Sequence, residues 1–180
     1  MQTFKGILAG AAWVAVAGMA QAGQSSFGKE AHGAVISFDD TIWAAKDLGI
    51  NPYFTCIAPD CGAASCMVIA SLDPDFAKWP ETPDAASLAA LQEVFLADVK
   101  SGGHDEAKVV APMQPSKIGS HDTLFVAIAT NYWGGWLSSR YMLREAGDTR
   151  IVTCEGDSDS MNKFKPQIDA LVGGITFYQQ

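Results

Sequence analysis

The sequence has few basic residues, three histidines and no polybasic cluster. Its 12 lysines and arginines stand against 20 acidic residues, which gives the chain a formal net charge of −8. Nucleic-acid binding depends on Lys and Arg neutralising phosphates, and binding to anionic lipid needs a basic cluster near the surface. The composition therefore argues against both of these partners, and it fits a basic or neutral partner or a role of the charge in solubility alone.

Long apolar runs are also absent after the first 22 residues. Lys5 precedes an apolar run of small residues, 6–19, and Ala20-Gln21-Ala22 follows it. A basic start, a short apolar core and small residues at −3 and −1 are typical of a cleavable secretory signal, whereas a membrane-spanning helix needs about 20 strongly apolar residues. We predict residues 1–22 to be a cleavable signal peptide, with an uncleaved anchor as the alternative.

Cleavage would leave residues 23–180, a length typical of a single domain. Losing Lys5 would make the net charge one unit more negative. No cysteine follows the small residues, so no lipid anchor is expected. We therefore predict a secreted or periplasmic protein that does not contact the membrane after the signal is removed.

Familiar catalytic motifs are missing. The G-x-S-x-G elbow of serine hydrolases is absent, and Ser158, which follows a predicted strand, has no histidine after it. His104 and His121 each have an acidic neighbour, but the members of a catalytic triad meet in space and are not sequence neighbours. A small periplasmic hydrolase that uses His121 or His104 is kept as an alternative, and solvated loop histidines are the simpler interpretation.

Metal-binding patterns are missing as well. Zinc sites favour two separated cysteine pairs, usually with histidine, whereas three of the four cysteines here share one short segment. The acidic loop 157–162 lacks the sixth-position glycine and the distal glutamate of a calcium loop. We expect no metal and no cofactor.

Four cysteines in an exported chain predict two disulfides. Cys56, Cys61 and Cys66 are evenly spaced, and Cys154 lies far downstream. If Cys56 and Cys154 both face the core, they bridge two strands and Cys61–Cys66 closes the turn between them. If Cys56 and Cys66 are cross-strand partners, Cys61 pairs with Cys154. We favour the first pairing and keep the second open.

The hydrophobic pattern predicts strands, one amphipathic helix, a meander of strands and a final helix. In the helix that starts with Thr82 as N-cap, Leu88, Leu91, Phe95 and Val99 recur at helical spacing. A final helix is predicted over 163–172. A loose N-terminus is predicted over 24–31, and loops are predicted over 73–83 and around Pro112 and Pro115. The predicted strands cover 34–38, 41–45, 53–57, 66–72, 108–111, 123–133, 136–144, 150–154 and 175–177. This order predicts an α+β fold, with a single twisted antiparallel β-sheet and two helices packed on it.

The order of these elements resembles the PsbP-like fold family. The resemblance rests on the helix after the first hairpin and on the ending of the chain, 150–154, 164–171 and 175–177. The family includes extrinsic photosynthetic proteins, periplasmic lipoproteins and secretion-system accessory proteins. The resemblance implies a binding or accessory role more often than catalysis, and it supplies no site residues to carry over.

Aromatic residues flank the predicted hairpin tip at Gly134-Gly135. Tyr132, Trp133 and Trp136 form a candidate patch, since Trp and Tyr commonly anchor interfaces, and the alternative is that one of the tryptophans packs on the sheet. Our leading hypothesis is a disulfide-stabilised binding or accessory protein without catalysis, which binds a protein partner through this tip. A third hypothesis is an inhibitor or immunity-type protein that blocks one partner protein.

Overall fold

The computed structural model describes residues 22–27, 33–46, 48, 51–69, 78–131, 135–145 and 148–177. Their strands and helices, in chain order, are β1 (Ala22–Phe27), β2 (Ala34–Asp39), β3 (Trp43–Lys46), β4 (Tyr53–Cys56), β5 (Ser65–Ile69), α1 (Ala85–Ser101), β6 (Lys108–Ile118), β7 (His121–Thr130), β8 (Trp136–Glu145), β9 (Asp148–Asp157), α2 (Ser158–Lys163), α3 (Lys165–Gly173) and β10 (Ile175–Phe177).

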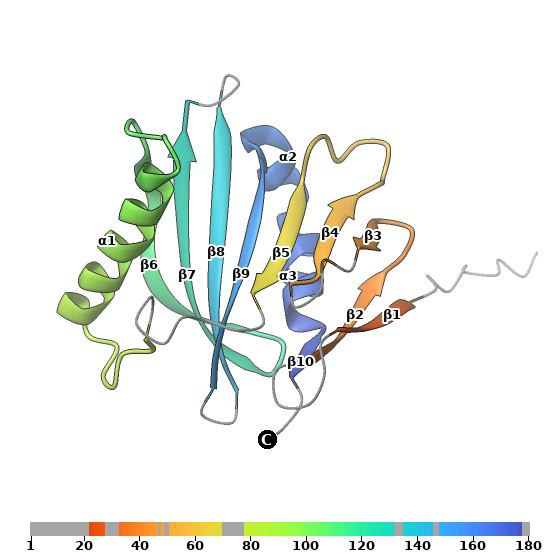
Figure 1. The fold of residues 1–180 in the computed structure, drawn as a ribbon, viewed down its shortest axis with the longest axis horizontal. Helices are drawn as coiled ribbons and strands as arrows, with labels where there is room; N and C mark the ends of the chain where they lie inside the picture. Colours follow the sequence, from red (N-terminus) through yellow and green to blue (C-terminus); the bar gives the residue numbers. More distant parts are fainter. Residues whose placement is uncertain are drawn as a thin grey trace, which may run out of the picture.

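The strands of the described residues form two antiparallel sheets (Figure 1). The large sheet has the order β3-β4-β5-β9-β8-β7-β6, and the small sheet has the order β1-β2-β10. The α+β class and the antiparallel pairing are as predicted, but the single sheet with two helices is wrong. The second sheet was missed because β2 pairs with the two ends of the chain, and a hydrophobic pattern does not show which distant strands meet.

The large sheet is apolar on both faces, which places two hydrophobic cores on its opposite sides. On β7 and β8, Leu124, Val126 and Met142 pack toward Leu91, Phe95 and Val99 of α1. Tyr141 and Leu143 alternate with them and pack on the other side with α2, α3 and the small sheet. Because successive side chains of a strand point to opposite faces, these two strands contribute apolar side chains to both cores.

Helix α1 lies at the β6 end of the large sheet (Figure 1). Its N-cap is Asp84, whose carboxylate accepts a hydrogen bond from the backbone N–H of Ser87 at 2.9 Å, and not Thr82 as predicted. The predicted apolar stripe is confirmed at Leu91, Phe95 and Val99, which are buried.

Three further segments differ from the sequence prediction. Residues 22–27, expected to be loose from 24 onward, form β1 and pair with β2 along its whole length. Strand β6 continues through Pro112 and Pro115, which is possible because β6 is an edge strand and a proline there loses no ladder bond. The predicted final helix over 163–172 is found as α3, which has Pro166 in its first turn, whereas α2, which precedes it across a break at Phe164, was not predicted.

The cysteines form two disulfides, but neither predicted pairing is found. Cys56 pairs with Cys61, and Cys66 pairs with Cys154. Strand β5, and not β4, is the neighbour of β9, so Cys66 lies directly opposite Cys154. Cys56 bonds across the hairpin to Ala64, not to Cys66, and the intervening turn folds Cys61 back to within 6.0 Å (Cα–Cα) of Cys56.

Replacing Leu91 with Asp should destabilise the domain by several kcal/mol, because the substitution buries an unpaired carboxylate under α1. Val94→Asp on the same helix is the matched control, since Val94 is 38 % exposed, and it should change the free energy of unfolding by about 1 kcal/mol or less. Urea denaturation of both variants measures the difference. Equal stability of the two would show that the predicted stripe does not carry the core.

The two disulfides should contribute unequally to stability. The Cys66–Cys154 bridge closes a loop of 88 residues and the Cys56–Cys61 bridge a loop of 5, so the chain-entropy model assigns them about 4–5 and about 2 kcal/mol respectively. Denaturation of the C66A/C154A and C56A/C61A double variants tests this order. A larger loss in the C56A/C61A variant would contradict it.

Candidate functional site

Three segments that are distant in sequence converge beside the N-terminal end of β7. They are the β2–β3 region, the turn between β6 and β7, and helix α3. Between them lies an apolar pocket of about 650 Å³, a size within the range of small-molecule sites. The apolar side chains along its wall are Phe38, Ile42, Trp43, Pro166, Ala170 and Leu171.

A second, polar pocket of about 520 Å³ adjoins the apolar one. Its wall includes Gln114, Ser116 and Lys117 of β6 and Lys165 of α3. Gly119 and Asp169 line both pockets, so the two form one continuous surface, which we call the groove. The groove therefore has an apolar part and a polar part that meet at Asp169.

Close backbone contacts hold the walls of the groove together. Gly119 has a φ of +60°, and a Cβ there would lie 2.9 Å from the carbonyl oxygen of Gly173. A Cβ on Gly174 would overlap the carbonyl oxygen of Ser37, whose N–H donates to the Gly174 carbonyl at 2.9 Å. Glycine at 119 and 174 is therefore what lets the turn and β2 approach the end of α3.

Asp169 is the centre of the polar contacts in the groove. Both of its carboxylate oxygens accept hydrogen bonds from the Lys165 ammonium, at 2.9 and 2.7 Å, and one also accepts from the Tyr141 hydroxyl at 3.2 Å. The same ammonium lies 5.2 Å from the centre of the Phe125 ring and 5.9 Å from that of Tyr141. A carboxylate and two aromatic rings thus surround one cation.

The Tyr141 hydroxyl is a hydrogen-bond donor in this cluster and not a base. Burial, and then the neighbouring Asp169 carboxylate, raise the pKa of the Tyr141 phenol well above its usual value. The phenol therefore keeps its proton at neutral pH. Lys165 and Asp169 compensate each other's charge, and the described lining of the groove contains no histidine or cysteine.

Two hydrogen-bond acceptors that line the apolar pocket accept few hydrogen bonds. The side-chain oxygen of Gln167 is buried and has no hydrogen-bond partner. Asp39 accepts from the backbone N–H and the hydroxyl of Thr41, and no ion pair is found for it within the described part of the chain. The apolar pocket is therefore bordered by acceptor groups.

The two histidines named for a hydrolase lie outside the groove. His121 is 2 % exposed, and its Nε2 lies 2.7 Å from the backbone carbonyl of Ile175, so its ring fixes β10 against β7. His104 lies in the turn after α1, where its carbonyl accepts from the Ala107 N–H. Neither side chain lines either pocket.

The aromatic hairpin tip is only partly within the described residues. Tyr132 and Trp133 lie outside them. Trp136 is half-buried at the start of β8, where it pairs with Thr130 and Asp157. Five residues of β7 separate Phe125, in the groove, from Thr130 beside Trp136, so the two regions are about 17 Å apart along the strand. A partner surface at the tip stays a prediction.

Ser158 and the acidic loop around it have a structural role. Asp157 is the N-cap of α2 and accepts from the backbone N–H of Ser160 at 2.8 Å. The Ser160 side chain and backbone hold the pKa of Asp157 below its usual value. Across the ranges that the structure describes, no group of three or more His, Cys, Asp or Glu residues could hold a metal ion.

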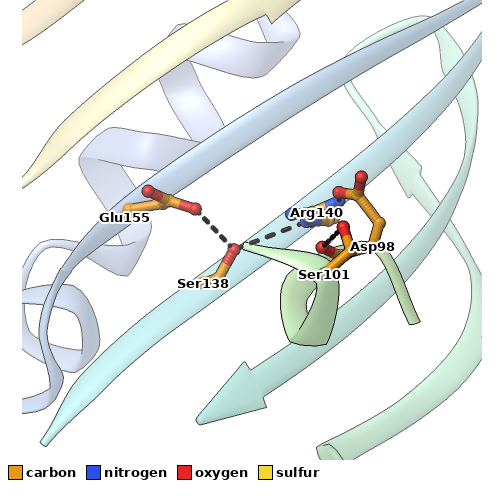
Figure 2. Close-up of polar contacts among 5 residues, drawn as sticks. All are labelled: Asp98, Ser101, Ser138, Arg140 and Glu155. Carbon is orange, nitrogen blue, oxygen red and sulfur yellow. Dashed lines mark hydrogen bonds and ion pairs between the residues drawn. The ribbon is translucent and has the colours of Figure 1, made fainter. Parts of the chain in front are cut away.

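A second polar cluster, on the opposite face of the large sheet, connects α1 to β8 and β9 (Figure 2). Arg140 contacts the carboxylate of Asp98 at 2.5 Å and lies over the ring of Phe95. The Ser138 hydroxyl donates to Glu155 at 3.0 Å and accepts from Arg140 at 3.5 Å. The cluster joins Asp98 of α1 to Arg140 of β8 through an ion pair, so we assign it to anchoring α1.

No protein-family model and no curated protein sequence matches the chain. Solved structures that share its fold include the following two. Cyanobacterial PsbP from Synechocystis has a TM-score of 0.58 at 9 % identity, over 92 % of this chain and 97 % of that one. LpqN of Mycobacterium tuberculosis, described as involved in cell envelope biogenesis, has a TM-score of 0.53 at 8 % identity, over 88 % of this chain and 92 % of that one.

The PsbP-like fold that the ending of the chain indicated is therefore confirmed. At these identities the likeness shows the fold alone, so no residue of the groove is assigned from either structure. Within the described residues, none of the helices combines the length and the apolar character needed to cross a membrane.

The close contact at Gly174 predicts that alanine substitutions at two neighbouring glycines change the stability of the domain differently. Gly174→Ala should destabilise the domain by about 1–3 kcal/mol, because the new methyl group overlaps the Ser37 carbonyl. Gly173→Ala is the control: its Cβ would make ordinary contacts, the nearest at 3.5 Å, and alanine favours the helix by up to about 1 kcal/mol. Thermal unfolding compares them, and equal melting temperatures would contradict the contact that holds α3 against β2.

Proposed function

We propose that this chain is a secreted or periplasmic accessory protein that binds a small apolar or amphipathic ligand in the groove and performs no catalysis on it. The observation that carries the proposal is the apolar pocket of about 650 Å³ beside a polar pocket, with Asp169 at their junction. Sites for small molecules are concave and mostly apolar, with a few placed polar groups.

The chemistry of the groove supports binding rather than catalysis. The hydroxyl of Tyr141 keeps its proton, and the ammonium of Lys165 is bonded to Asp169. A general base needs a group that titrates near the working pH and reaches the substrate. The hydrolase alternative has no support in the groove, because His104 and His121 lie elsewhere.

The two disulfides support an extracytoplasmic location. All four cysteines are bonded, and Cys61, Cys66 and Cys154 are almost completely buried. Bridges of this kind persist in oxidising compartments such as the periplasm or the extracellular space. They agree with the secretory signal proposed for residues 1–22, and N-terminal sequencing of exported protein would identify Gly23 as the first residue.

The binding proposal is tested with the neutral fluorescent dye N-phenyl-1-naphthylamine. Ala170 is an exposed helical alanine on the wall of the apolar pocket, and Ala170→Trp should fill the pocket and reduce dye affinity by about tenfold or more. Ala90→Trp on α1 is the matched control, since Ala90 is also exposed but lies outside the groove. Unchanged dye binding in the Ala170→Trp variant, or no binding to the unmodified protein, would refute the proposal.

Binding of a protein partner at the hairpin tip is tested separately, because the tip lies at the other end of β7. Trp133→Ala should abolish capture of such a partner from a periplasmic extract while the Ala170→Trp variant retains it. A stoichiometric enzyme among the captured proteins would favour the inhibitor hypothesis.

A further inference from the structure

The groove contains four charged side chains, and two of them already neutralise each other. The Lys165 ammonium and the Asp169 carboxylate form an ion pair at the junction of the pockets. Lys117 lies on β6 in the polar pocket, and Asp39 lies in the apolar pocket. The carboxylates of Asp39 and Asp169 are therefore the charged groups that border the apolar pocket.

The junction of the two pockets already accommodates a positive charge. Asp169, Phe125 and Tyr141 surround an ammonium group through two short hydrogen bonds and two ring contacts of 5.2 and 5.9 Å. A carboxylate beside aromatic faces is a favourable environment for an organic cation. The cation in this environment is the side chain of Lys165, which comes from the same helix as Asp169.

We propose, on the basis of the binding function above, that the ligand of the groove is an amphipathic cation: an apolar group that fills the apolar pocket and carries an ammonium group. The ammonium group would take the place of Lys165 beside Asp169, Phe125 and Tyr141. Lys165 would then act as an internal competitor that occupies the cation position until the ligand binds.

Displacing Lys165 costs little. Its side chain is 49 % exposed, and Lys165 and Asp169 are four residues apart on one helix. Exposed pairs of this kind contribute little to stability. The released ammonium moves into water, whereas the ligand gains the burial of its apolar part.

The charge of the whole chain favours the same ligand class. The net charge of −8 attracts cations and repels anions over the distance of a diffusional encounter. Lys117 is exposed on β6 and is the one lysine of the groove that would favour an anion. Because Lys117 lies in the polar pocket, tighter binding of an anionic ligand is a separate possible result of the titrations described next.

Three ligands of equal chain length separate these possibilities: octylammonium, octanol and octanoate, each titrated calorimetrically into the disulfide-bonded mature protein at low ionic strength. Octylammonium should bind about tenfold or more tightly than octanoate, and more tightly than octanol. Lys165→Ala should strengthen octylammonium binding by about threefold or more and leave octanol unchanged. Lys163→Ala is the matched control, because Lys163 forms its ion pair with Asp60 away from the groove.

The results separate failure of this inference from failure of the binding function. Equal affinity for octylammonium and octanol, with no effect of Lys165→Ala, would overturn the inference and leave an apolar binding site. Tighter binding of octanoate would also overturn it and would assign the polar pocket to an anion. If none of the three ligands binds, the proposed function fails together with the inference.

The source of the cation is distinguished by a peptide probe. Acetyl-leucyl-lysine amide and acetyl-leucyl-glutamine amide are titrated in the same way. A preference for the lysine peptide that increases in the Lys165→Ala variant would assign the cation to a basic side chain of a protein partner. Binding of octylammonium without that preference would assign it to a free amphipathic amine.

Discussion

The central strands of the large sheet are buried on both faces, and the rest of the structure depends on this. Strands β7, β8 and β9 must supply apolar side chains to α1 on one side and to α2 and α3 on the other. Each face then needs its own cover, because an exposed apolar face of this size would associate with other molecules. The small sheet and α3 form part of one cover, and the groove lies where that cover meets the β6–β7 turn.

Features that depend on local sequence were predictable, and features that depend on distant pairing were not. The spacing of Leu91, Phe95 and Val99 was enough to predict α1, and the short turns were enough to predict the meander of β7, β8 and β9. The disulfide pairing depended on whether β4 or β5 lies beside β9, which no local pattern of Cys56 or Cys66 reveals. Helix α2 was missed for a different reason, because the acidic loop predicted over 157–162 begins with Asp157, which is in fact the N-cap of a helix.

The candidate site was not predictable from the sequence for the same reason. Asp39, Gly119 and Asp169 come from three parts of the chain and meet only in the folded structure. The one local signal was the pair Gly173-Gly174, interpreted as the end of a helix, although Gly174 also permits close contact with Ser37. Aromatic residues at the hairpin tip gave a stronger sequence signal than any residue of the groove, and this directed the prediction to the other end of β7.

In the proposed complex, the groove holds the apolar part of a ligand against α3 and β3 with its ammonium group at Asp169. The most direct test is an NMR experiment on the mature protein with bound octylammonium, in which contacts between ligand and protein protons are measured. We expect contacts from the octyl chain to the methyl groups of Ile42 and Leu171, and from the carbon next to nitrogen to the rings of Phe125 and Tyr141. Contacts confined to the hairpin around Trp136, or to the α1 face of the large sheet, would contradict it.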